Sequence, residues 1–183
     1  MSTLVGRDKT ALMVIDVQNG VVEGAYNLES VVANIGLAID KARASGTPVI
    51  WVQHSDEELE IDSDAWQIVD QLQPVAGEPI VRKTFRSSFE GTNLEEILSG
   101  LNVSHLVITG MQTNNCIRHT THSALERGYD VTLVTDAHTT TGYEWGGHKI
   151  DASEVVDETN DNLGGYQLPG RGARGLTAEA LSF

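Results

Sequence analysis

The chain has 183 residues, of which 40% are hydrophobic, and a formal net charge of −14 at pH 7. This length and composition suit one folded domain, so we expect a single domain over residues 1–183 and no extended disorder. The acidic balance argues against nucleic acids and anionic membranes as partners, because proteins that bind them usually carry basic patches.

The predicted elements alternate between short apolar runs and helical patterns. The first run, TALMVIDV at 10–17, is continuous, which is typical of a strand buried on both faces. Apolar residues three or four apart predict a helix over 28–45, and Gly46 would end it. Further strands are predicted at 47–53, 79–85, 105–110 and 130–137. Further helices are predicted at 65–72, 93–101, 116–127 and 151–162, and the glycine-rich segment 164–175 is predicted to be irregular.

This alternation predicts a three-layer α/β/α fold with a mostly parallel central sheet and right-handed crossovers. In such sheets, ligands bind beyond the carboxyl ends of the strands. Asp16, Lys83 and Cys116, the only cysteine, lie at or just beyond three predicted strand ends. Each also has a simpler interpretation: a carboxylate that caps a turn, a surface lysine and an inert buried thiol.

A cysteine, a carboxylate and a lysine could together transfer the acyl group of an amide. Cys116 stands at the start of a predicted helix, where unpaired N–H groups and a nearby lysine would stabilise a thiolate. A carboxylate could accept the thiol proton and return it to a leaving amine. The same N–H groups could bind an oxyanion.

The stretches around these residues resemble those of the isochorismatase-like cysteine hydrolases, which include nicotinamidases, N-carbamoylsarcosine amidohydrolases and streptothricin hydrolase. The resemblance spans nearly the whole chain and is carried by ALMVIDVQNG, VRKTFRSSFEGTNLEEIL and LVITGMQTNNCIRHTTHSALERGYDVTLVTDAHTT. It implies that Cys116 is a nucleophile that forms an acyl-enzyme. It also implies that Asp16 is the general acid/base, and that Lys83 positions Asp16 and favours the thiolate.

The resemblance further implies a cis peptide bond between Met111 and Gln112, and an oxyanion hole formed by the backbone N–H groups of Gln112 and Cys116. The implied activity is hydrolysis of a C–N bond in a small amide, ureide or cyclic amide, by a homodimer or larger homo-oligomer. Two alternatives stay open: an isochorismate-type vinyl-ether hydrolase and a non-catalytic binding protein on the same fold. The first needs no cysteine nucleophile, so Cys116 argues against it.

The sequence departs from metal-dependent nicotinamidases after the second predicted strand. Those enzymes carry an Asp–x–His and further histidines there. In this chain the matching stretch is HSDEELEIDSD at 54–64, and His54 is its single histidine. His54 and the acidic residues could bind a cation, but their spacing matches no calcium loop, and a solvated loop is the simpler interpretation. His119 and His122 lie three apart on a predicted helix without a third ligand. We therefore expect a metal-independent enzyme without a cofactor.

Four residues are expected to contact the substrate because of where they fall in the chain. Gln18 and Asn19 follow Asp16, Trp66 follows the acidic stretch, and Trp145 lies in a loop that could cover the site. Each is also an ordinary packing residue, and an acidic loop beside the pocket leaves room for a cationic substrate. The single cysteine and the absence of a signal-peptide pattern or a long apolar run predict a cytoplasmic protein.

Overall fold

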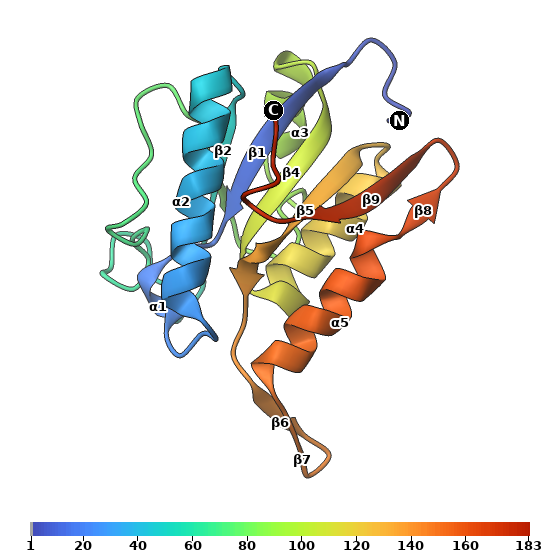
Figure 1. Cartoon of the computed structure of the whole chain (residues 1–183). Helices are drawn as coiled ribbons and strands as arrows, with labels where there is room; N and C mark the ends of the chain where they lie inside the picture. Colours follow the sequence, from blue (N-terminus) through green and yellow to red (C-terminus); the bar gives the residue numbers. More distant parts are fainter. Residues whose placement is uncertain (1) are drawn as a thin grey trace.

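Strands and helices alternate along the chain in the computed structural model, which describes residues 2–183 (Figure 1). The strands are β1 (Lys9–Ile15), β2 (Val49–His54), β3 (Ile80–Lys83), β4 (Val103–Met111), β5 (Asp130–Thr139), β6 (Tyr143–Trp145), β7 (His148–Ile150), β8 (Gln167–Leu168) and β9 (Arg171–Leu176). The helices are α1 (Asn19–Val22), α2 (Leu28–Ser45), α3 (Leu94–Gly100), α4 (Arg118–Glu126), α5 (Ala152–Gly164) and a π-helical turn, η1 (Thr113–Ile117).

Seven of the strands form one sheet in the order β3-β2-β1-β4-β5-β9-β8. Its pairings are parallel except that between β8 and β9 at one edge, so the predicted mostly parallel sheet is confirmed. β6 and β7 form a separate antiparallel hairpin. The central strands are buried on both faces, which explains why their sequences are continuous apolar runs rather than alternating ones.

Helices cover both faces of the sheet, as the three-layer prediction requires. On one face, Ile108 of β4 belongs to a core that includes Leu125 of α4 and Leu163 of α5. On the other face, Ile35 of α2 and Leu181 near the C-terminus belong to a second core. No helix within residues 2–183 is both long and apolar enough to cross a membrane.

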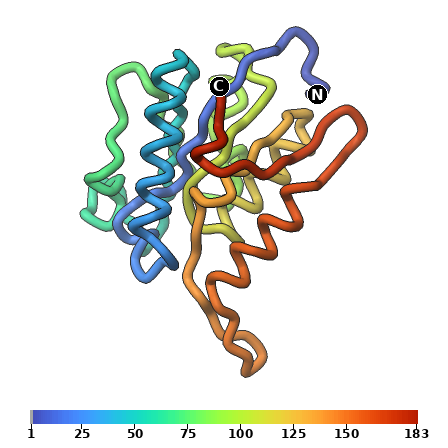
Figure 2. The backbone as a smooth tube through the Cα atoms, viewed as in Figure 1, coloured from blue at the N-terminus to red at the C-terminus, as the bar shows by residue number. Residues whose placement is uncertain are grey.

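The two ends of the sheet have different surroundings. The segment before β1 and the C-terminal segment lie at one end of the molecule, and the β6–β7 hairpin projects from the opposite end (Figure 2). Because β1, β2, β3 and β4 are parallel, their carboxyl ends share one edge of the sheet. That edge is where a ligand site is expected in an open α/β sheet.

In two segments, the secondary structure differs in type from the prediction. No helix forms at 65–72, because its backbone bonds instead to the chain that follows β1: Asn19 N–H donates to the Gln67 carbonyl, and Val69 N–H to that of Val17. The segment 164–175, predicted to be irregular, contains β8 and most of β9, and β9 pairs with β5.

Two glycines of β9 stand where the backbone has close neighbours. A Cβ atom added at Gly175 would lie 2.8 Å from the Thr135 methyl group, and one at Gly172 would lie 2.6 Å from the Gln167 side chain. Glycine in a strand often marks such a close approach. The glycine content led to a prediction of irregular structure, whereas in this strand small residues allow a close approach of neighbouring groups.

Gly110 allows the carboxyl ends of β4 and β1 to approach each other. Its φ is +121°, and an added Cβ atom would lie 2.0 Å from the Ile15 carbonyl oxygen. We expect Gly110→Ala to lower the free energy of unfolding by about 3 kcal/mol or more, because it adds both overpacking and backbone strain. Urea denaturation measures this change. Gly100→Ala is the control, since Gly100 has open space around its Cα, and equal losses in both variants would contradict the packing argument.

Candidate active site

Four neighbouring strands each bring one side chain to the same edge of the sheet. Lys83 ends β3, His54 ends β2, Asp16 directly follows β1, and Cys116 lies in η1, shortly after β4. The strands are parallel, so these groups meet where their carboxyl ends lie side by side. The structure thus brings together the three residues singled out from the sequence and adds His54.

Lys83 is the centre of this group. Its Nζ lies 2.6 Å from Asp16 Oδ2 and 3.3 Å from Cys116 Sγ. The same atom lies 3.1 Å from the Phe85 carbonyl oxygen and 3.3 Å from His54 Nδ1. The exposed fraction is 2% for Lys83 and 0% for Asp16, so the two charges are buried as a pair. Charges this deep in a protein are stable only when they are paired and hydrogen-bonded.

Asp16 has an unusual backbone conformation at the end of β1. Its φ is +52°, in the left-handed region, which costs an L-residue other than glycine roughly 1–2 kcal/mol. The Asp16 N–H donates to the Val52 carbonyl at 3.0 Å, so the turn is held against β2. Residues with such backbone strain cluster at functional sites, because the surrounding structure must hold them in place.

The electrostatics of the site favour a neutral thiol in the resting protein. Burial and the neighbouring Asp16 carboxylate raise the pKa of Cys116 to about 12, against the opposing effect of Lys83. Burial also raises the pKa of Asp16 above its ordinary value, although Lys83 and Cys116 oppose this shift. The expectation of a stabilised thiolate is therefore wrong for the resting state, because desolvation and a like charge outweigh the lysine.

The raised pKa of Cys116 predicts how the thiol responds to alkylation. Iodoacetamide should modify Cys116 slowly at pH 7, and the rate should still be rising with pH above 9, because only the thiolate reacts. Asp16→Asn removes the like charge and should therefore make alkylation at pH 8 faster than in the wild type. Mass spectrometry of the modified chain over time measures both rates. A wild-type rate that levels off below pH 8 would contradict the raised pKa.

The segment between β4 and Cys116 has further features that the family resemblance implies. The peptide bond between Met111 and Gln112 is cis. Gln112 and Cys116 both line the cavity that also reaches Asp16. The predicted helix start at 116 is corrected, since the π-helical turn begins at Thr113 and α4 follows it. The oxyanion hole formed by the Gln112 and Cys116 N–H groups stays a prediction.

A cavity of about 480 Å³ opens above Cys116, and its wall carries several charged groups. The acidic residues at the wall, besides Asp16, are Glu23, Asp56 and Glu58, and the basic one is Arg86. The remaining lining residues are Gly20, Val21, His54, Leu59, Ala65, Gln112 and Asn115. Acidic groups outnumber basic ones among the lining residues, which raises the local concentration of positively charged solutes.

Gln18 and Trp66, two of the four expected substrate contacts, have structural roles and do not line this cavity. The Gln18 amide is fully buried and binds both backbone groups of His54, accepting from its N–H at 2.8 Å and donating to its carbonyl at 2.9 Å. It also donates to the Trp66 carbonyl at 2.8 Å. Trp66 is buried, and the Arg82 guanidinium lies over its ring.

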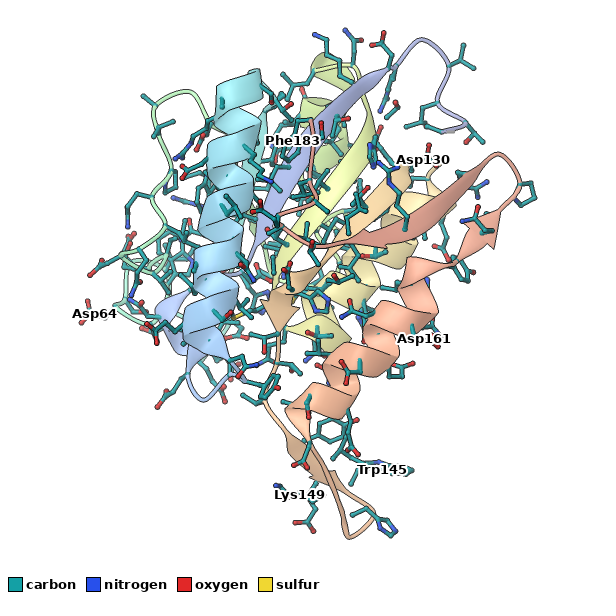
Figure 3. All side chains as sticks on the ribbon, in the orientation of Figure 1. Asp64, Asp130, Trp145, Lys149, Asp161 and Phe183 are labelled. Carbon is teal, nitrogen blue, oxygen red and sulfur yellow. The ribbon has the colours of Figure 1, made fainter. Side chains whose placement is uncertain are left out.

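The other two expected contacts also lie outside the cavity wall. Asn19 donates from its side-chain amide to the Asp64 carbonyl at 2.9 Å, which fixes the acidic loop to the start of α1. Trp145 is 76% exposed and lies on the β6–β7 hairpin, which projects from the body of the molecule (Figure 3). Trp145 therefore does not cover the site in this structure.

The two histidines of α4 make other contacts. His119 Nδ1 is 2.8 Å from the Asn115 carbonyl oxygen, and His122 packs edge-on against Tyr166. Within residues 2–183, no three His, Cys, Asp or Glu side chains are grouped as metal ligands. Neither histidine lines the cavity.

In the sequence, His54 is a candidate cation ligand only. The structure places it against Lys83 and Asp56 instead, with His54 Nε2 3.1 Å from Asp56 Oδ2. One signal could have found this role: His54 stands at the carboxyl end of a predicted strand, as do Asp16 and Lys83. Arg86 carried no such signal, because it lies on a loop after β3.

Comparisons with known proteins identify the family and agree with the fold. The family model described as the isochorismatase domain matches residues 10–156. An uncharacterised isochorismatase family protein, YrdC of Bacillus subtilis, is 33% identical over 137 residues, covering 71% of this chain and 73% of that one. Streptothricin hydrolase of Streptomyces noursei is 31% identical over 140 residues, or 73% of this chain and 56% of that one. A crystal structure of an isochorismatase from Pseudomonas putida superposes with a TM-score of 0.86 at 26% identity, covering 97% of this chain and 94% of that one.

Proposed function

Because the chain belongs to the isochorismatase family, we propose that it hydrolyses a C–N bond of a small amide, ureide or cyclic amide through an acyl-enzyme on Cys116. The observation that carries this proposal is the buried contact of Lys83 Nζ with both Asp16 and Cys116. A nucleophile, a carboxylate and a cation at these distances have the roles that acyl transfer needs.

In the first half of the proposed reaction, the Asp16 carboxylate accepts the Cys116 proton as sulfur attacks the substrate carbonyl carbon. Its raised pKa suits this role, because a carboxyl group that holds a proton more firmly is a stronger base. The carbonyl oxygen gains the negative charge, which the Gln112 and Cys116 N–H groups would stabilise. Asp16 then gives the proton to the leaving nitrogen, the C–N bond breaks, and a thioester remains.

In the second half, water attacks the thioester carbon. Asp16 accepts a proton from this water, the C–S bond breaks, and the proton returns to Cys116 as the acid leaves. The Lys83 ammonium stays charged throughout and stabilises whichever of Asp16 and Cys116 is negative. No redox step or added cofactor is needed for this sequence.

The substrate is proposed to carry a positive charge. Glu23, Asp56 and Glu58 face the cavity against the single Arg86, and the chain as a whole is strongly acidic. Opposite charges at the mouth of a cleft act mainly on capture, so the effect should appear in kcat/KM.

This charge preference predicts a difference between matched substrates. Glu58→Gln should lower kcat/KM for a cationic amide by about twofold to fivefold and leave a neutral amide of the same size unchanged, as expected for an exposed charge pair. The difference should shrink at high salt. Glu57→Gln is the control, since Glu57 is a neighbour that does not line the cavity. Equal losses for the cationic and neutral amides would contradict the preference.

A screen of small amides, ureides and cyclic amides tests the reaction class. The wild type and Cys116→Ala are assayed in parallel, so that turnover by a contaminant is recognised. Prior alkylation with iodoacetamide at high pH should abolish C–N hydrolysis. Vinyl-ether cleavage that survives alkylation would overturn the proposal in favour of isochorismate-type chemistry.

A further inference from the structure

Lys83 Nζ has more acceptors within reach than it has hydrogens. The ammonium carries three N–H groups, and it lies near the Asp16 carboxylate, the Cys116 sulfur, the Phe85 carbonyl and His54 Nδ1, each within 3.3 Å. Two of these acceptors, the Phe85 carbonyl oxygen and His54 Nδ1, take no part in the proton transfer of the proposed reaction. The other two, Asp16 and Cys116, exchange a proton and therefore exchange a negative charge.

Asp56 determines which nitrogen of the His54 ring faces Lys83. Burial alone would raise the pKa of Asp56, but the N–H groups of Leu59 and Glu58, together with His54, lower it below the ordinary value. The carboxylate is therefore ionised at neutral pH and can only accept hydrogen bonds. With a single ring hydrogen, His54 donates from Nε2, at 3.1 Å from Asp56 Oδ2, and Nδ1 keeps the lone pair that accepts from Lys83.

We propose that His54, oriented by Asp56, is a positioning residue that anchors the Lys83 ammonium so that Asp16 and Cys116 share its remaining N–H group. This inference rests on the proposed function. Phe85 O and His54 Nδ1 occupy two hydrogens and fix the orientation of Nζ. The third hydrogen can then follow the negative charge from Asp16 to Cys116 as the proton moves the other way, with little movement of the lysine.

The loss of the His54 acceptor should leave Asp16 with a permanent hydrogen bond. The freed N–H group would turn to the remaining acceptors, and the carboxylate is the strongest of them and the nearest, at 2.6 Å. Asp16 is faced by Lys83, Cys116 and His54, and the Lys83 ammonium is its ion-pair partner. An Asp16 held in its ionised form is a weaker base and opposes a thiolate beside it, so Cys116 should become less reactive.

Two substitutions of His54 separate its contact with Lys83 from its contact with Asp56. Asparagine places an amide oxygen near the position of Nδ1 and so keeps the acceptor for Lys83. Glutamine reaches toward the position of Nε2 and so keeps a donor for Asp56 but loses the acceptor. We expect His54→Gln and His54→Ala to alkylate at Cys116 about tenfold more slowly than wild type at pH 9, and to lose about 10- to 100-fold in kcat on an amide substrate. His54→Asn should stay within about threefold of wild type in both measurements.

His148→Asn, on the exposed hairpin, is the control for histidine substitution as such, and thermal unfolding shows whether each variant folds. The alkylation rates need no substrate, so they test the inference even if no amide is hydrolysed. The order asparagine above glutamine and alanine supports the anchoring of Lys83, whether or not the hydrolase proposal succeeds. Equal alkylation rates in the three folded His54 variants, or glutamine above asparagine, would overturn it.

Discussion

Cys116→Ala is expected to lower kcat/KM on a confirmed amide substrate by on the order of 10⁴-fold or more, because it removes the proposed nucleophile. The side chain is small and only partly buried, so the fold should survive the change. Steady-state kinetics with purified variant and wild type measure the loss. Mass spectrometry of the wild type with a slow substrate should also show a mass increase on the peptide that contains Cys116.

Cys116→Ser is the matched control for this experiment. It keeps the shape of the side chain but replaces a thiol with a hydroxyl, which is harder to ionise and depends more on a strong base than Asp16 can supply. We expect its activity to fall nearly as far as that of the alanine variant, while its melting temperature stays close to that of the wild type. Near-wild-type turnover by Cys116→Ala would remove the nucleophile from the proposal and show that the hydrolysis needs no thiol.

The fold was predictable where local pattern and packing agree. α2 begins at Leu28 and ends at Ser45, the predicted bounds, because its apolar face is periodic and Gly46 adopts the left-handed conformation of a C-cap. The helix predicted at 65–72 failed because its apolar residues, among them Val69 and Leu72, are buried in an irregular segment that bonds to the chain after β1. Tertiary contacts overrode a short pattern there.

From the sequence, only those residues of the candidate site that lie near the ends of predicted strands could be predicted. Asp16, Lys83 and Cys116 each follow from the rule that ligands bind at the carboxyl ends of parallel strands. The contact between Lys83 and His54 needs more, because it depends on the register of β2 against β3, in which these two residues are directly paired. Sequence periodicity predicts the two strands but not their relative register.

The charge state of the Cys116 thiol could not be predicted from the sequence either. A cysteine near a helix start and a lysine suggested a thiolate, which would hold at an exposed site. In the structure, burial and the Asp16 carboxylate decide the balance, and both raise the pKa of Cys116. Burial depends on the whole fold, so a sequence motif identifies the reacting group without fixing its resting protonation state.

Lys83→Met is expected to destabilise the fold as well as to abolish activity. It leaves the Asp16 carboxylate buried without its counter-charge, and removing one partner of a buried ion pair costs about 3–5 kcal/mol of unfolding free energy. The loss should be smaller at pH 5 than at pH 8. Without the ammonium, the pKa of Asp16 rises further above its ordinary value, so the folded state is favoured at low pH and this contribution is lost as pH rises. Urea denaturation at the two pH values measures both effects.

The double variant Asp16→Asn, Lys83→Met separates stability from catalysis. With both charges removed, no uncompensated ion remains in the core, so the unfolding free energy should recover to within about 1–2 kcal/mol of the wild type or exceed it. Activity should not recover, because both the proton acceptor and the ammonium are gone. A double variant as unstable as Lys83→Met would show that the stabilisation lies in the packing of the lysine stem rather than in the ion pair. The expected result shows instead that the ion pair itself adds little net stability, because the cost of burying two charges offsets most of their attraction.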